Sequence, residues 1–132
     1  MNTLKGEIIS IKVNGNLSLV TINVSDIIFK TIVIENPDTA SYLKTGNKIN
    51  VIFKETEVVI GKGLEHFVSL QNRLTGNIIE IENGALLSKL TIDTPVGNIV
   101  AIITLDAVVQ LKLQVGEIIT AMIKTNEIML SE

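Results

Sequence analysis

The chain repeats itself at a spacing of 70 residues. Aligning each residue with the one 70 positions later gives identities along most of the chain, among them Leu4/Leu74, Gly6/Gly76, Ile8/Ile78, Thr21/Thr91, Ile22/Ile92, Leu43/Leu113, Gly46/Gly116, Lys54/Lys124 and Glu57/Glu127. A fixed spacing over so long a span indicates a tandem duplication, in which each copy is one supersecondary unit. The sequence therefore predicts two repeats, at residues 1–63 and 64–132.

Each repeat has the pattern of five short strands and one short helix. The first strand alternates polar and apolar residues, as in Glu7–Ile11, and leads to an Asn-Gly pair, which is the strongest short hairpin signal. A helix is expected between the third and fourth strands, capped by Asn36 or Asp106 and ended by Gly46 or Gly116. We therefore predict an all-β fold of two tandem, five-stranded, OB-like barrels, each with one short helix and each closed by its own fifth strand. The fifth strands are expected at residues 58–60 and 128–130.

Composition limits the possible functions. Hydrophobic residues make up 46% of the chain but aromatic residues only 3%, so the core is expected to be aliphatic. The mean hydropathy of +0.45 is high, yet no apolar run approaches the roughly 20 residues of a spanning helix, so we expect the excess apolar surface to lie between subunits rather than in a membrane. The N-terminus lacks a secretory pattern, and a cytoplasmic location is expected. The net charge of −3 and the scarcity of aromatic residues argue against nucleic-acid binding.

One stretch, Ser69-Leu70-Gln71-Asn72-Arg73-Leu74-Thr75-Gly76, gathers hydroxyl, amide and guanidinium groups directly before a strand. These groups are suited to binding an anion, and we interpret the stretch as a ligand-binding edge. Each residue also has a structural interpretation. Ser69 and Asn72 could cap a turn, Gln71 could be an exposed strand-edge amide, and Arg73 could form a surface ion pair.

With these residues the sequence resembles the molybdate-binding Mop (molbindin, or TOBE) domains in their tandem form. The family opens with Ser-Ala-Arg-Asn-Gln-Leu-x-Gly, which Ser69, Asn72, Leu74 and Gly76 match. Its closing pattern resembles Ile-Lys-Thr-Asn-Glu-Ile-Met-Leu at residues 123–130. The resemblance extends over nearly the whole chain.

The resemblance implies a small cytoplasmic protein, or an accessory domain of a transporter or regulator, that holds molybdate or tungstate at interfaces between subunits. It also implies a homo-oligomer, most simply a compact trimer of tandem units. In the family the anion is held by the serine and arginine of the opening motif, by backbone N–H groups, by a turn threonine and by the late lysine. When the family's ligand set is transferred to this sequence, the candidate binding residues are Ser69, Asn72, Thr104 and Lys124.

The sequence departs from the family at two places. Gln71 stands where the family has arginine, and Arg73 stands where it has glutamine; residues two apart share a face of an extended segment, so we expect Arg73 to supply the charge. The first repeat lacks the opening motif and has Ile34 in place of the turn threonine, although it keeps Lys54. We therefore expect a complete site to take its motif from the second repeat, with candidate residues Ser69, Gln71, Asn72, Arg73, Thr104, Lys124 and Lys54.

A tetrahedral dianion can be held by converging donors without a metal ion or catalysis. No catalytic triad, phosphate loop or metal-ligand spacing is present in the sequence, and an enzyme is not expected. The alternative is a module that associates with itself or with a transporter and whose anion site has degenerated. The sequence does not distinguish molybdate from tungstate.

Overall fold

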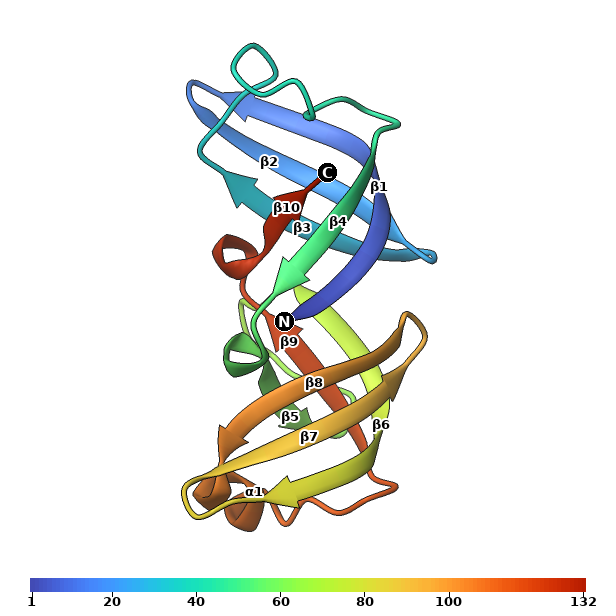
Figure 1. Ribbon diagram of the computed structural model, residues 1–132, viewed down its shortest axis with the longest axis vertical. Helices are drawn as coiled ribbons and strands as arrows, with labels where there is room; N and C mark the ends of the chain where they lie inside the picture. The colour runs from blue at the N-terminus through green and yellow to red at the C-terminus, as the bar shows by residue number, and fades with distance from the viewer.

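The computed structural model describes residues 1–132 and consists of two small barrels stacked end to end (Figure 1). The first sheet has the strand order β10-β4-β1-β2-β3, formed by Met129–Ser131, Lys48–Phe53, Asn2–Asn14, Leu17–Val24 and Ile27–Val33. The second has the order β5-β9-β6-β7-β8, formed by Val59–Lys62, Ile118–Ile123, Asn72–Asn83, Leu87–Thr94 and Gly97–Thr104. All pairings are antiparallel. The predicted all-β fold of tandem, OB-like, five-stranded barrels is confirmed.

The duplication is visible in details of the strands as well as in their number. The register between β1 and β2 shifts between Ile8 and Ser10, and that between β6 and β7 shifts at the equivalent place, between Ile78 and Glu80. The predicted first hairpin turns at Gly15, whose φ of +61° suits a glycine. The same bulge in both copies bends each first strand around its barrel.

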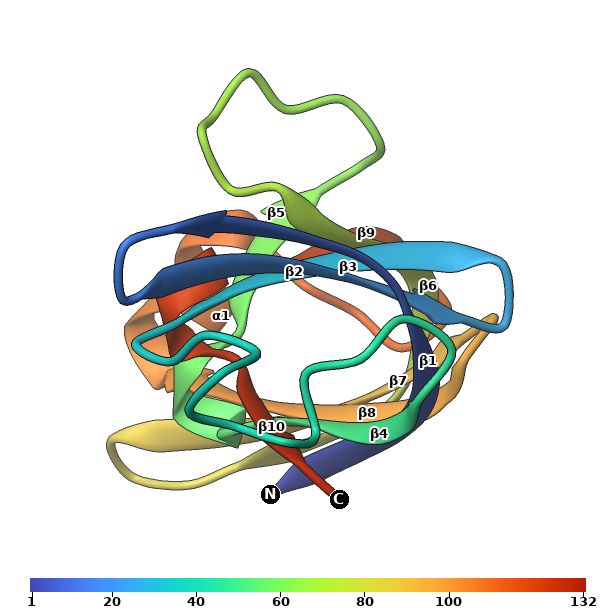
Figure 2. The same cartoon turned by 90° about the horizontal axis from the view of Figure 1, so that it is seen from above.

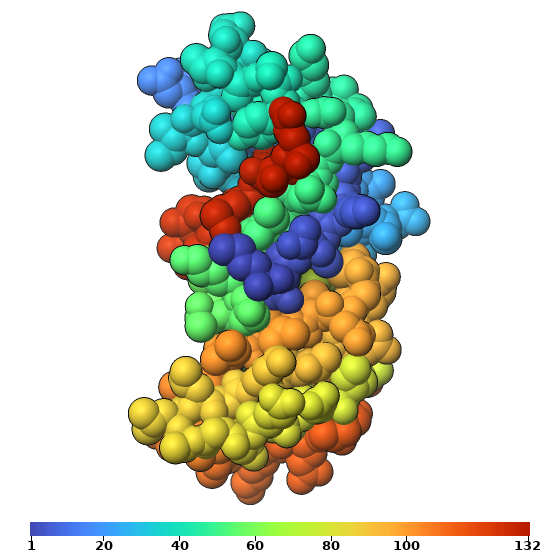
Figure 3. Space-filling view, in the orientation of Figure 1, coloured from blue at the N-terminus to red at the C-terminus, as the bar shows by residue number.

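The fifth strands are exchanged between the barrels, so the prediction that each repeat closes its own barrel is wrong. β5 pairs with β9 of the second barrel, and β10 pairs with β4 of the first. Figure 3 shows the C-terminal segment in red lying on the first barrel. The 3₁₀ turns η1 (Glu55–Glu57) and η2 (Thr125–Glu127) connect each barrel's fourth strand to the strand that crosses to the other barrel. At this crossing η1 contacts β8 of the second barrel, and η2 contacts β3 of the first. The predicted boundaries 1–63 and 64–132 thus describe a repeat in sequence, while each barrel contains a strand from the other repeat.

The predicted helix is present only in the second repeat, as α1 (Leu105–Leu111). Its N-cap is Thr104 rather than the predicted Asp106, since the Thr104 hydroxyl accepts a hydrogen bond from the N–H of Ala107 at 3.1 Å. It ends at Lys112, which has a φ of 52°, rather than at Gly116.

In the first repeat the equivalent segment forms turns, so the second predicted helix is wrong. Asn36 does cap a turn there, because its Oδ1 accepts hydrogen bonds from the N–H groups of Asp38 and Thr39 at 2.9 and 3.1 Å. The rest of the segment contains only turns, at residues 37–39, 41–42 and 45–46.

A single hydrophobic cluster of 24 buried residues fills both barrels. Phe29 and Phe53 are its only aromatic members, which confirms the predicted aliphatic core. At the contact between barrels Thr31 is fully buried, and its hydroxyl lies 2.8 Å from the carbonyl oxygen of Ile128 and 3.1 Å from that of Thr125. The only α-helix has seven residues, and no helix is long and apolar enough to cross a membrane.

Candidate anion-binding site

The opening segment lies where the two barrels meet. Asn72 begins β6 and pairs with Ile123 of β9, so the preceding residue, Gln71, faces the following one, Lys124. Ser69, Gln71 and Lys124 are exposed. We call this place the Lys124 junction, formed by the start of β6, the end of β9 and the facing edge of β3. The structure thus brings the opening segment and the late lysine together.

The side chain of Asn72 links the two barrels by hydrogen bonds. Its side chain is 1% exposed; Oδ1 accepts a hydrogen bond from the N–H of Lys30 at 2.6 Å, and Nδ2 donates to the carbonyl oxygen of Lys30 at 2.8 Å. Asn2, at the equivalent position of the first repeat, makes the same pair of hydrogen bonds to Val100, both at 2.8 Å. Each asparagine therefore continues the edge of the other barrel's sheet. Because it is buried and hydrogen-bonded, the Asn72 side chain is closed to a ligand in this chain.

Arg73 organises the loop before it. Its Nε donates to the carbonyl oxygen of Leu70 at 2.7 Å, and its two terminal nitrogens donate to those of His66 and Val68, both at 2.8 Å. We call residues 63–71 the arm; Figure 2 shows that it stands off the stacked barrels. Three of the five guanidinium N–H groups are used inside the arm, so the charge is directed to carbonyl oxygens rather than to an open site.

The base of the arm is also fixed. The hydroxyl of Thr120 on β9 donates to the carbonyl oxygen of Gly63 at 2.7 Å. The ring of His66 packs over Gly61, where a Cβ would lie 2.5 Å from the ring Cε1. At the tip, Phe67 is 100% exposed. The arm is therefore an ordered projection with an apolar tip.

Replacing Arg73 with glutamine is expected to loosen the arm without unfolding the barrels. The change removes most of the donors that bind the carbonyl oxygens of residues 66–70, while the strand pairing of residue 73 is retained. We expect hydrogen exchange of the arm amides to rise at least about tenfold, with a change in the free energy of unfolding below about 1.5 kcal/mol. Unchanged exchange in residues 64–71 would contradict this role for Arg73.

Lys54 lies at the equivalent junction of the first repeat, which we call the Lys54 junction. Lys54 precedes η1, and Met1 faces it just as Gln71 faces Lys124, since Asn2 pairs with Phe53. The ammonium group of Met1 forms an ion pair with Glu55 at 3.1 Å. Thr104 lines an apolar hollow of about 490 Å³ next to η1. The structure therefore places Lys54 and Thr104 on the η1 side, whereas Ser69, Gln71, Asn72, Arg73 and Lys124 belong to the Lys124 junction.

The lysines at both junctions form no ion pair within the chain. The chain has only two ion pairs, Met1 with Glu55 and Lys62 with Glu117, so Lys54 and Lys124 are free to meet an external anion. The acidic residues of the two 3₁₀ turns face each other instead. Partial burial and the neighbouring side chain of Glu127 raise the pKa of Glu57, and the charge of Lys54 acts in the opposite direction.

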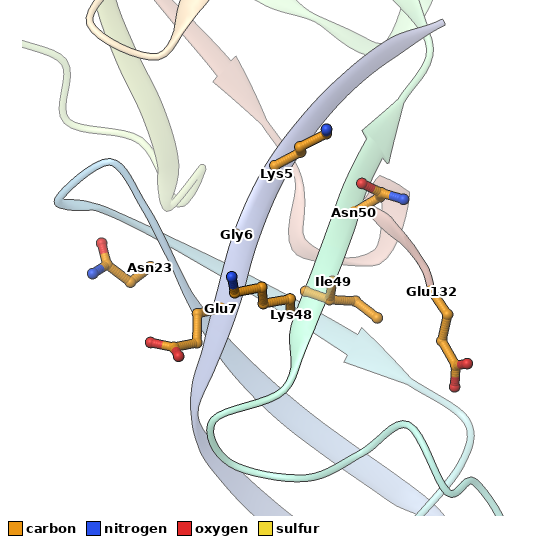
Figure 4. A pocket seen from close by; sticks show the side chains of 8 residues that line it. All are labelled: Lys5, Gly6, Glu7, Asn23, Lys48, Ile49, Asn50 and Glu132. Atoms are coloured by element: carbon orange, nitrogen blue, oxygen red, sulfur yellow. The ribbon is translucent and has the colours of Figure 1, made fainter.

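A separate hollow of about 530 Å³ lies on the outer face of β1 and β4. Figure 4 shows that Lys5 and Lys48 line it together with the carboxylates of Glu7 and Glu132. The two negative charges offset the two lysines, and the side chains do not converge on one point. This hollow is therefore a poor site for a dianion.

Comparison with known proteins supports the resemblance seen in the sequence. The family model of the TOBE domain matches residues 69–130. The cytoplasmic molybdate-binding protein ModG, solved with molybdate bound, superposes with a TM-score of 0.90 and 26% sequence identity, covering 98% of this chain and 94% of ModG. A molybdate-binding protein from Sporomusa ovata is 31% identical over its full length, covering 51% of this chain and 100% of that chain with a TM-score of 0.49. Residues 69–130, the second repeat, belong to the TOBE family.

The likeness to ModG extends over both barrels, so the tandem Mop form predicted from the sequence is confirmed. No curated protein sequence matches this chain closely enough to count as a relative.

Proposed function

We propose that this protein binds molybdate, and with it tungstate, as an intact oxyanion in the cytoplasm, for storage, buffering or sensing. The observation that carries the proposal is the Lys124 junction, in which an unpaired, exposed lysine lies opposite the segment that matches the family's anion-binding motif. Lys124 supplies a point charge, the Ser69 hydroxyl and the Gln71 amide supply neutral donors, and nearby backbone N–H groups complete the set. Lys54 and Thr104 are candidates for a second, less complete position.

The donors of the Lys124 junction lie on the surface of one chain and do not enclose a volume, which supports a site completed by a neighbouring subunit. Large apolar side chains are exposed on the barrels and the arm, including Ile28, Ile32, Ile34, Phe67, Leu86 and Val109. Apolar surface of this extent is typical of an obligate interface. We propose a homo-oligomer, most simply a trimer, with the anion bound between chains.

Isothermal titration of the protein with molybdate, tungstate, sulfate and phosphate tests the proposal. We expect heat from molybdate and tungstate and little from phosphate, because a protonated phosphate would leave its O–H unpaired among donors, at a cost of about 1–3 kcal/mol. Lys124→Gln should weaken molybdate binding about tenfold or more, since it removes a charge-assisted hydrogen bond. Absence of heat with every oxyanion would overturn the proposal.

The second candidate function is an interaction module without an anion. The internal use of Asn72 and Arg73 favours it, because two of the motif's residues hold the barrels and the arm instead of pointing to an open site. A stable oligomer in sedimentation, combined with no oxyanion binding in the titration, would support this function over the first.

A further inference from the structure

The second repeat's motif asparagine binds the backbone of a lysine in the first barrel. Asn72 holds both the N–H and the carbonyl oxygen of Lys30, at 2.6 and 2.8 Å, and this fixes Lys30 beside the opening segment. We infer that Lys30 is an anion-binding residue of the Lys124 junction and supplies the positive charge that the family arginine would give at Gln71. The inference rests on the proposed function, because it assigns a further residue to the same site.

The charges that this chain supplies at the junction favour a second cation. Molybdate carries two negative charges, and Lys124 provides one positive charge. Gln71 is neutral, and the guanidinium of Arg73 is bound to the carbonyl oxygens of Leu70, His66 and Val68. Burying a dianion between subunits with a single charge opposite it would leave a costly imbalance.

Lys30 is placed to correct this imbalance. It lies in β3 between Phe29 and Thr31, both fully buried in the barrel, so alternation along the strand turns the Lys30 side chain to the outside. It is half-buried and forms no ion pair or side-chain hydrogen bond within the chain. Its long stem leaves the ammonium group free to reach a ligand beside Gln71.

The equivalent junction lacks this charge. Lys30 corresponds at the 70-residue spacing to Val100, and Arg73 corresponds to Thr3. The nearby ammonium group of Met1 is paired with Glu55 at 3.1 Å. Lys89 on β7 lies near this junction, and its charge helps to lower the pKa of Glu55. No lysine occupies the position of Lys30 there, so the Lys124 junction is the site with a cation next to the motif asparagine.

The test is isothermal titration of the full chain and its variants with molybdate. Lys30→Gln should weaken binding by about tenfold to a hundredfold, the loss of one charge-assisted hydrogen bond, whereas Lys30→Arg should stay within about threefold of the wild type. The matched control is Lys44→Gln, which removes one charge from the loop between β3 and β4, at the end of the first barrel remote from the junction (Figure 1). We expect this control to bind as the wild type does.

The outcomes separate the two proposals. If the wild type binds molybdate and Lys30→Gln binds it equally well, or if Lys44→Gln is weakened as much as Lys30→Gln, the role of Lys30 is wrong while the proposed function stands. If the wild type binds no oxyanion, the proposed function is wrong and Lys30 has no anion to bind. Thermal unfolding of Lys30→Gln should match the wild type, because Asn72 binds only the backbone of residue 30.

Discussion

Asn72→Ala is expected to lower the free energy of unfolding by about 2–4 kcal/mol. The substitution leaves the N–H and the carbonyl oxygen of Lys30 without their partner at the contact between barrels, and each such loss costs about 1–3 kcal/mol. Urea denaturation monitored by circular dichroism measures the change.

The duplicated chain offers matched controls for this prediction. Asn2→Ala removes the equivalent pair of hydrogen bonds to Val100 and should cost a similar amount. Asn72→Asp keeps an acceptor for the Lys30 N–H but places a buried carboxylate oxygen against the Lys30 carbonyl oxygen, so it should destabilise the protein at least as much as Asn72→Ala. A cost below about 0.5 kcal/mol for Asn72→Ala would show that the barrels are held together by other contacts.

Gly76→Ala is expected to destabilise the protein by at least about 3 kcal/mol. A Cβ at this position would overlap the backbone carbonyl oxygen of Asp93 and lie 2.8 Å from Cγ2 of Ile92. The neighbouring strand cannot give way without disturbing the register of β6 and β7. The glycine that ends the family's opening motif is thus explained by strand packing in this chain.

Two other glycines calibrate the effect in the same denaturation experiment. At Gly6 the nearest atoms are side-chain methyl groups of Ile22 and Val24, at 2.5 and 2.8 Å, which can move in part, so Gly6→Ala should cost less than Gly76→Ala. Gly15 has open space around its Cβ position and a φ of +61°, so Gly15→Ala should cost only about 1 kcal/mol. Equal effects at positions 15 and 76 would contradict the packing explanation.

The fold was accessible from the sequence because its signals are local or periodic. Alternation marks the strands, Asn14-Gly15 marks the first hairpin, and the 70-residue spacing reveals the duplication. The exchange of β5 and β10 between the barrels could not be predicted from the sequence. Their apolar patterns suit either barrel equally well, since the two repeats present nearly the same edge, and the choice depends on the path of the chain through η1 and η2.

The candidate site could be predicted from the sequence only in part. The family resemblance nominated both the opening segment and Lys124, but the register that places Gln71 opposite Lys124 was not predicted. The partners of Asn72 and Arg73 could not be predicted either, because groups that bind an anion bind backbone carbonyl oxygens equally well. One signal for Asn72 was present, namely Asn2 at the equivalent position of a repeat that otherwise lacks the motif. No comparable signal existed for Lys30, whose place beside the motif depends on the contact between barrels.

Anomalous diffraction from a crystal soaked in tungstate or molybdate tests the anion site most directly. We expect a strong anomalous peak at the Lys124 junction, contacted by the ammonium groups of Lys124 and Lys30 and by the hydroxyl of Ser69, at a contact between chains. A soaked crystal with no peak there, with Lys124 and Lys30 directed into separate regions of solvent, would contradict both the site and the proposed function.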